Sequence, residues 1–154
     1  MTAHSMNQPA LEATAVTDRD HPQLRDLSRE ECLALLEDSL IGRIGYVVDG
    51  LAVILPVNFV LLNGDIVFCT AKGGTLAWLS NRRRVAFEVD ESRPAEREGW
   101  SVLVHGSAHE VTDPDQLEVL RRGPLRSWVR TPAEHWVRIT VDSMSGRALQ
   151  HSRT

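Results

Sequence analysis

The stretch that decides the fold runs from Ile41 to Asp90. It contains four apolar pieces, IGRIGYVV (41–48), LAVILPVNF (51–59), DIVFCT (65–70) and VAFEVD (85–90). Gly50 and the pair Asn63-Gly64 separate the first three pieces, and Asn-Gly is a strong signal for a tight hairpin turn. The sequence therefore predicts consecutive antiparallel strands across this region.

The predicted sheet contains one nearly continuous apolar segment and is extended by two later strands. From Val53 to Leu62 the apolar positions are nearly continuous, so we expect burial on both faces, as in a barrel wall. Residues 100–111 form a long strand in which Gly106 marks a bulge or a close approach. Residues 136–141 close the sheet. The charged segment 90–99, which contains Pro94, is expected to be a loop.

Short helices accompany the strands. Ser28 with Glu31 forms a capping box that begins a helix running to about Asp38. A second helix is expected from Thr75 to about Asn81, and a third from Asp115 to about Arg122, capped by Thr112-Asp113-Pro114. About six antiparallel strands without a strand–helix–strand rhythm favour a mainly β barrel with short flanking helices over a doubly wound fold.

Length and composition limit the functions that this chain can have. The chain has 154 residues, of which 42% are hydrophobic and 25% charged, so one globular domain is expected over residues 25–154, behind a flexible polar tail of residues 1–24. The net charge of −4 argues against a nucleic-acid binder. No apolar run approaches the roughly 18–20 residues of a membrane span, and the N-terminus lacks the plan of a secretory signal.

Cys32 and Cys69 stand far apart without a metal or redox spacing. We interpret them as buried thiols of a cytoplasmic protein. The turn Gly73-Gly74-Thr75 opens the second predicted helix, and free backbone N–H groups at such a helix start could bind an anionic group such as a cofactor phosphate.

Five motifs stand in an order that resembles the pyridoxamine 5′-phosphate oxidase-like family of FMN-binding split β-barrels. They are Gly42-Arg43-Ile44-Gly45, Pro56-Val57-Asn58-Phe59, the corner from Thr70-Ala71 to Leu76, Phe87-Glu88-Val89-Asp90, and Gly99-Trp100-Ser101-Val102 with Gly106. Ser145-Gly146-Arg147 also resembles the basic C-terminal strand of the family. The resemblance implies a six-stranded antiparallel split β-barrel and a homodimer with two FMN molecules in clefts between the subunits.

The resemblance also implies site residues. One strand would lie along the flavin ring, a second strand end would reach the ribityl chain and phosphate, and the partner subunit would add a third group. These groups are, in turn, Leu55, Pro56, Val57 and Asn58; Phe68, Cys69 and Thr70; and Trp100 and Ser101. Arg147 of the basic C-terminal strand is a further expected site residue. Other roles remain open, namely a strand edge for Pro56, a turn-side polar position for Asn58 and the core for Trp100.

The phosphate corner departs from the family pattern. Thr75 stands where the family usually places lysine or arginine, and the nearest cation is Lys72. Lys72, Gly74 and Thr75 are therefore the residues expected to hold the phosphate, through one ammonium, backbone amides and a hydroxyl.

Three functions follow from this interpretation. The first is an FMN-dependent oxidoreductase acting on a small molecule, in which the flavin supplies the redox chemistry. The second is a deazaflavin-dependent reductase, for which Arg82-Arg83-Arg84 could anchor a long anionic tail instead of merely facing solvent. The third is a non-enzymatic flavin-binding or haem-binding module. His105 and His109 are spaced to share a strand face, but a metal site is not expected because no third ligand lies nearby.

Overall fold

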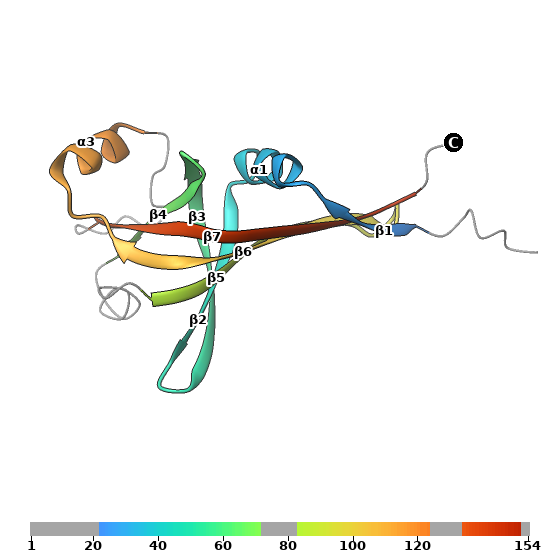
Figure 1. Cartoon of the computed structure of the whole chain (residues 1–154), viewed down its shortest axis with the longest axis horizontal. Helices are drawn as coiled ribbons and strands as arrows, with labels where there is room; N and C mark the ends of the chain where they lie inside the picture. The colour runs from blue at the N-terminus through green and yellow to red at the C-terminus, as the bar shows by residue number, and fades with distance from the viewer. Residues whose placement is uncertain (1–21, 72–82, 124–133, 152–154) are drawn as a thin grey trace, which may run out of the picture.

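The computed structural model describes residues 22–71, 83–123 and 134–151. In this part of the chain, antiparallel strands dominate and two helices lie beside them (Figure 1). The elements are β1 (Gln23–Leu27), α1 (Arg29–Glu37), β2 (Ile41–Val48), β3 (Leu51–Leu62), β4 (Asp65–Ala71), β5 (Arg83–Arg93), β6 (Glu98–Glu110), α3 (Pro114–Arg122) and β7 (Glu134–Gln150).

Six of the strands form a closed ring. Its order is β7-β4-β3-β2-β5-β6, and the pairing of β6 with β7 closes it. Every pairing is antiparallel. The predicted six-stranded antiparallel split β-barrel is therefore confirmed, with β1 added to β7 as a seventh strand.

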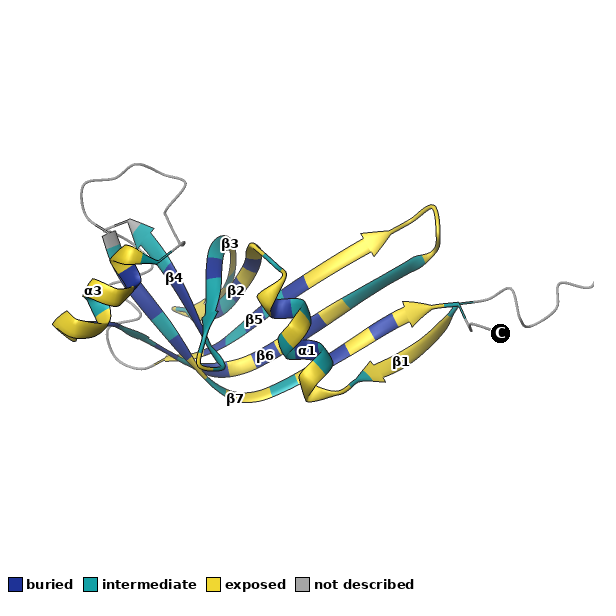
Figure 2. Ribbon diagram, turned by 90° about the horizontal axis from the view of Figure 1, so that it is seen from above, coloured by how far each residue is buried: buried dark blue, intermediate teal, exposed yellow. Residues whose placement is uncertain are grey.

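The long strand β7 joins the barrel to this extra strand. Along one edge it pairs first with β4, from Ile66↔Ile139 to Ala71↔Glu134, and further on with β1, from Leu27↔Gly146 to Gln23↔Gln150. Along the other edge it pairs with β6. Between its β4 and β1 partners, α1 lies over the sheet (Figures 1 and 2).

Local sequence explains the tight turns and the first helix. Asp49 and Gly50 have φ values of 49° and 78°, and Asn63 and Gly64 have 53° and 82°. These left-handed conformations suit two-residue hairpin turns. The predicted capping box is present, because the Ser28 hydroxyl accepts from the Glu31 amide at 3.2 Å and the Glu31 carboxylate accepts from the Ser28 amide at 2.7 Å.

The barrel interior holds the main core. Phe59 and Phe87 meet edge to face with ring centroids 4.9 Å apart, and Ile44, Ile66, Phe68, Val104, Val137 and Ile139 are buried around them. A second cluster lies on the opposite face of β4 and β7, where Val67 and Trp136 pack with Leu120 of α3. Figure 2 shows buried residues along the middle of the strands and exposed ones toward the β5–β6 turn.

The predicted irregularity at Gly106 is confirmed. The β6–β7 register shifts between His105 and Gly106. A Cβ at this glycine would lie 2.3 Å from the carbonyl oxygen of Thr140, so the two strands approach more closely than any side chain allows.

Several expectations were wrong. Residues 53–62 are not buried on both faces, since Phe59 is the one buried residue in β3; the β2–β3 hairpin extends beyond the neighbouring strands (Figure 1) and exposes its sides. The segment 90–99 is mostly strand, and the turn occupies only residues 94–97. β1 begins at Gln23, inside the segment assigned to the tail.

The helix starts predicted near Ser28 and Asp115 are confirmed. The helix expected at 75–81 and the rest of the predicted tail lie outside the described residues.

Candidate functional site

The β3 segment expected along the flavin ring has an open edge. In the described part of the chain, residues 51–58 pair with β2 on one side, and pairing with β4 on the other side begins only at Phe59. Pro56 stands opposite Arg43 and Asn58 opposite Ile41. A proline without an N–H group is tolerated at such an edge. The edge position considered for Pro56 is therefore correct, and it leaves backbone groups of this segment available to a ligand.

The end of β4 lies between the two cores. Phe68 belongs to the barrel core, whereas Cys69, which is paired with Trp136, packs with the second cluster. Thr70 is half-buried and pairs with His135 of β7. Lys72, Gly74 and Thr75, predicted for the phosphate, follow directly in the chain but lie outside the described residues.

Trp100, Ser101 and Arg147 come together at one cavity. Trp100 pairs with Ala148 and Ser101 pairs with Arg147 across β6 and β7. All three line a cavity of about 430 Å³ that also contains Glu88, Asp90, Glu91 and Glu98. Trp100 is half-buried and packs against the barrel core as well. Residues that the sequence separates by more than forty positions thus share one hollow.

Arginine side chains offset the negative charge of the carboxylates around this cavity. The Arg43 guanidinium binds Asp90 and lies 3.0 Å from Glu88. These hydrogen bonds, chiefly the one to Asp90, raise the pKa of Arg43 above its ordinary value. Arg93 lies 3.8 Å from both Glu91 and Glu98. The hollow is therefore polar but not a strongly anionic surface.

The predicted site residues form two separate groups in one chain. The described residues that line the Trp100 cavity include none of the β3 and β4 residues expected at the flavin. The first group lies on β3 and the end of β4, and the second on β6 and β7. A ligand in the Trp100 cavity of one chain would therefore contact only the second group.

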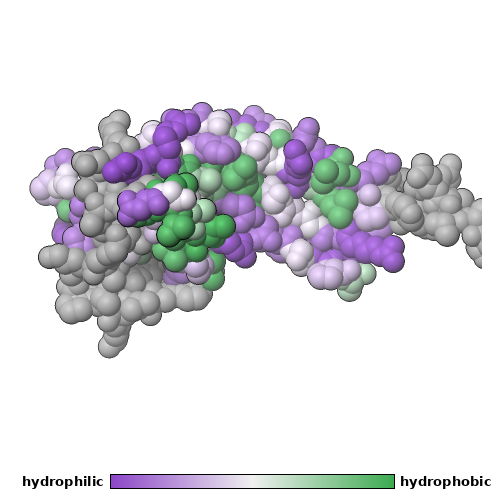
Figure 3. Space-filling view, turned by 90° about the horizontal axis from the view of Figure 1, so that it is seen from below, coloured by the Kyte–Doolittle hydropathy of each residue, from purple (hydrophilic) through white to green (hydrophobic). Residues whose placement is uncertain are grey.

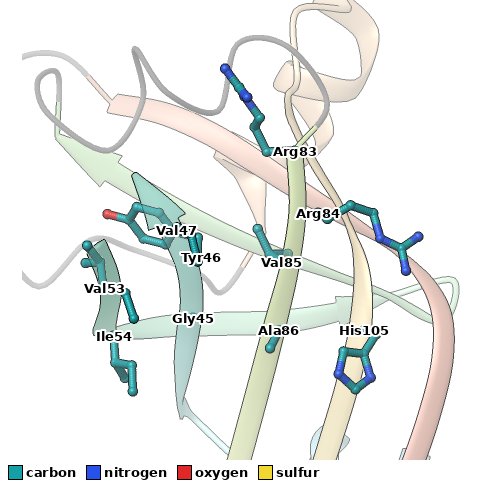
Figure 4. A pocket seen from close by; sticks show the side chains of 11 residues that line it. Gly45, Tyr46, Val47, Val53, Ile54, Arg83, Arg84, Val85, Ala86 and His105 are labelled. Atoms are coloured by element: carbon teal, nitrogen blue, oxygen red, sulfur yellow. The ribbon is translucent and has the colours of Figure 1, made fainter. Parts of the chain in front are cut away.

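A larger hollow, not foreseen from the sequence, lies on the outer face of β2, β3, β5 and β6. It measures about 790 Å³, and its lining includes Gly45, Ile54, Ala86 and His105 (Figure 4). A Cβ at Gly45 would meet the Ala86 Cβ at 3.8 Å, an ordinary contact. Small side chains on neighbouring strands therefore leave the hollow open.

Exposed apolar side chains line this hollow, as Val47 and Ile54 do, or lie near it along the same strands. Ile54 is 69% exposed, Val47 57% and Leu103 37%, and Leu51 at the hairpin end is 72% exposed. Figure 3, viewed from the side toward which the β2–β3 hairpin extends, shows an apolar patch among polar side chains. Contiguous apolar surface of this kind usually marks an interaction site.

A polar pair at the end of the barrel also escaped the sequence analysis. His135 Nδ1 lies 2.6 Å from Glu110 Oε1, and both side chains are half-buried. The two residues are 25 positions apart and belong to different strands, so no short motif signals their contact.

Two further findings concern other classes of site. Among the described residues, no group of three or more histidine, cysteine, aspartate or glutamate side chains is placed to hold a metal ion. Of the helices in the same residues, none has the length and apolar character to cross a membrane.

Comparison with known proteins identifies the family. The family model described as pyridoxamine 5′-phosphate oxidase matches residues 28–148. The chain is 34% identical over 135 residues to an uncharacterized protein of Mycobacterium tuberculosis, covering 84% of this chain and 88% of that protein. The chain therefore belongs to the pyridoxamine 5′-phosphate oxidase family, a flavin-binding family of split β-barrels.

Solved structures agree with this assignment. The FAD binding protein from Mycobacterium smegmatis is similar with a TM-score of 0.72 at 37% identity, over 83% of this chain and 100% of that one. The FAD and haem binding protein from the same organism has a TM-score of 0.65 at 20% identity, over 82% and 74%. At the latter identity the similarity shows the fold alone.

Proposed function

We propose that this protein is a homodimeric, flavin-dependent oxidoreductase that binds FMN between its subunits and acts on a small molecule. The division of the predicted site into two groups on one chain carries the proposal. The open edge of β3 would meet the flavin ring, and Trp100, Ser101 and Arg147 of the partner subunit would complete the cleft. Membership of a flavin-binding family supports the cofactor class.

The exposed apolar surface supports the homodimer. Val47 and Ile54 line one hollow, and Leu103 is exposed on β6, two residues before the lining residue His105. A second copy would bury these side chains. A two-fold dimer uses the same patch on both subunits. Cys32 and Cys69 are not joined in a disulfide, which agrees with a place in the reducing cytoplasm.

The residues fit a flavin in chemical character. The open edge of β3 offers backbone donors and acceptors, and Thr70 offers a hydroxyl beside the predicted phosphate corner of Lys72, Gly74 and Thr75. When bound, the flavin supplies the redox chemistry itself. The protein would then bind the ring, exclude water and shape the substrate pocket.

FAD is the alternative cofactor, because the 37% identical relative from M. smegmatis is described as an FAD binding protein. FMN and FAD share the ring, the ribityl chain and the first phosphate, so the same residues would contact that half of either molecule. The sequence also left a deazaflavin or a haem as alternative cofactors.

The absorption spectrum of the purified protein tests this function. Flavin maxima are expected, and the released cofactor, separated by chromatography before and after phosphodiesterase treatment, identifies FMN or FAD. Bleaching of the flavin bands by a nicotinamide reductant, followed by their return in air, would establish redox activity. A Soret band, deazaflavin fluorescence or failure to bind any added flavin at micromolar concentration would contradict the proposal.

A further inference from the structure

One row of residues crosses the floor of the larger hollow. Gly45 of β2 pairs with Ile54 of β3 and with Ala86 of β5, and Ala86 pairs with His105 of β6. Because directly opposed residues of antiparallel strands share a face, the four stand side by side on the outer face. Three strand spacings, roughly 14 Å in all, separate Ile54 from His105. The floor is therefore flat, with small residues in the middle and a large side chain at each end.

The two ends of this row differ in chemical character. At the β3 end, Ile54 is 69% exposed, and the neighbouring lining residue Val47 is 57% exposed. At the other end lie the ring nitrogens of His105 and, two residues before Ala86 on the same face of β5, the guanidinium of Arg84. Figure 4 shows Ile54 on one side and Arg84 and His105 on the other. A ligand that fits this floor is apolar at one end and polar at the other.

The charge of the lining has one sign. Of the lining residues that the structure describes, Arg83 and Arg84 carry charge and none is acidic, although the whole chain has a net charge of −4. Arg84 lies 2.7 Å from Asp142, but these side chains are 76% and 42% exposed. An ion pair in water is weak, and a guanidinium stays cationic at any ordinary pH. Charge complementarity therefore favours an anionic ligand.

We propose that this hollow binds a small aromatic anion. Its rings would lie on Gly45 and Ala86, with the apolar end toward Ile54 and the anionic group toward Arg84 and His105. A hollow of about 790 Å³ is of the size of known ligand pockets.

This site is separate from the groups expected at the flavin. Its described lining includes no residue of 55–58, of β4 or of the Trp100 cavity. In the proposed homodimer the bound anion would lie between the subunits, and only this placement rests on the proposed function.

The experiment compares naphthalene sulfonate with the neutral naphthalene sulfonamide, which has the same rings without the charge. Isothermal titration calorimetry of the full-length protein, as purified and saturated with FMN, measures both affinities. Wild type should bind one sulfonate per chain and bind it more tightly than the sulfonamide. Arg84→Gln should weaken the sulfonate about 3- to 5-fold, as expected for an exposed ion pair, and leave the sulfonamide unchanged.

Two further variants locate the site. Arg122→Gln is the matched control for Arg84→Gln, because Arg122 is 79% exposed and paired with Glu118 on α3, and it should change neither affinity. Ala86→Leu places a large side chain on the floor and should abolish binding of both probes. Circular dichroism checks its fold, and if it does not fold, the comparison of Arg84→Gln with Arg122→Gln decides.

Several results would overturn the inference. They are equal affinities of wild type for the two probes, normal binding by a folded Ala86→Leu variant, and loss of sulfonate binding on saturation with FMN, which would make the hollow part of the flavin site. A dimer that binds flavin but neither probe would show that the second copy fills the hollow, and the proposed function would stand. Protein that binds the probes as expected but no flavin would support the inference and contradict the proposed function.

Discussion

Gly146 of β7 lies directly against Cys32 of α1. A Cβ at residue 146 would lie 2.6 Å from the Cys32 sulfur and 2.9 Å from Cδ1 of Leu27. In the sequence, this glycine is notable only as part of Ser145-Gly146-Arg147. In the structure it allows α1 to pack onto β7 where that strand passes from β4 to β1.

Gly146→Ala is therefore expected to destabilise the protein by about 1–3 kcal/mol, the usual cost of overpacking a core. Gly45→Ala is the matched control, since its Cβ would make only ordinary contacts. Urea unfolding of both variants, followed by circular dichroism, measures the difference. Equal stabilities of the two variants would show that α1 does not pack tightly on β7.

The carboxylate of Glu31 gives a pH-dependent stability. Its pKa is lowered from 4.5 to about 2, first by the hydrogen bond from Arg25 and then by the bond from the Ser28 amide. Because the pKa is lower in the folded state, the stabilisation is complete above pH 4.5 and is lost as the pH falls toward 2. Glu31→Gln should thus be less stable than wild type at neutral pH, and this difference should shrink below pH 4.5.

The measurement is urea unfolding at several pH values between neutral and about 3. Glu30→Gln is the control, because it removes a carboxylate from the same first helical turn without touching the capping box. A difference between Glu31→Gln and wild type that stays constant with pH would contradict the role of this carboxylate.

Trp100 is expected to contribute more to flavin binding than to the stability of the fold. Removing a fully buried tryptophan costs about 3–5 kcal/mol, but Trp100 is only half-buried. Trp100→Ala should therefore cost less stability than this and lower flavin occupancy. Trp136→Ala is the matched control, because Trp136 is 2% exposed in the second core and should show the full loss.

Thermal unfolding of the flavin-free proteins and flavin titration separate the two effects. If Trp100→Ala unfolds like Trp136→Ala and its folded fraction binds flavin normally, Trp100 is a core residue and not part of the cofactor site.

Charge placed in the exposed apolar surface should dissociate the proposed dimer. Wild type is expected at a mass of two 17.2 kDa chains at micromolar concentration, by light scattering after gel filtration. Ile54→Glu or Leu103→Glu should shift the mass toward one chain, because a carboxylate would be buried without a partner. Val119→Glu is the control, since Val119 is 61% exposed on α3, apart from this surface. A wild-type monomer that binds flavin would refute the shared cleft.

The sequence by itself determined the features that depend on neighbouring residues. The hairpin at Asn63-Gly64 follows from two residues that tolerate positive φ. The start of α1 follows from the Ser28–Glu31 capping box, and the start of α3 from Asp113 and Pro114. The six-stranded ring could also be predicted, because the apolar pieces and turns leave few other arrangements and resemble a known family.

Only the tertiary structure decided which residues meet across the sheet and which faces stay open. The apolar run of β3 suggested burial on both faces. Burial depends on what the rest of the chain places against a strand, and little of the described part of the chain covers the β2–β3 hairpin. The pairing of β6 with β7, whose register shifts at Gly106, brings Trp100 and Arg147 to one cavity and His135 to Glu110. Such contacts depend on strand pairing between distant segments, which local residue preferences do not specify.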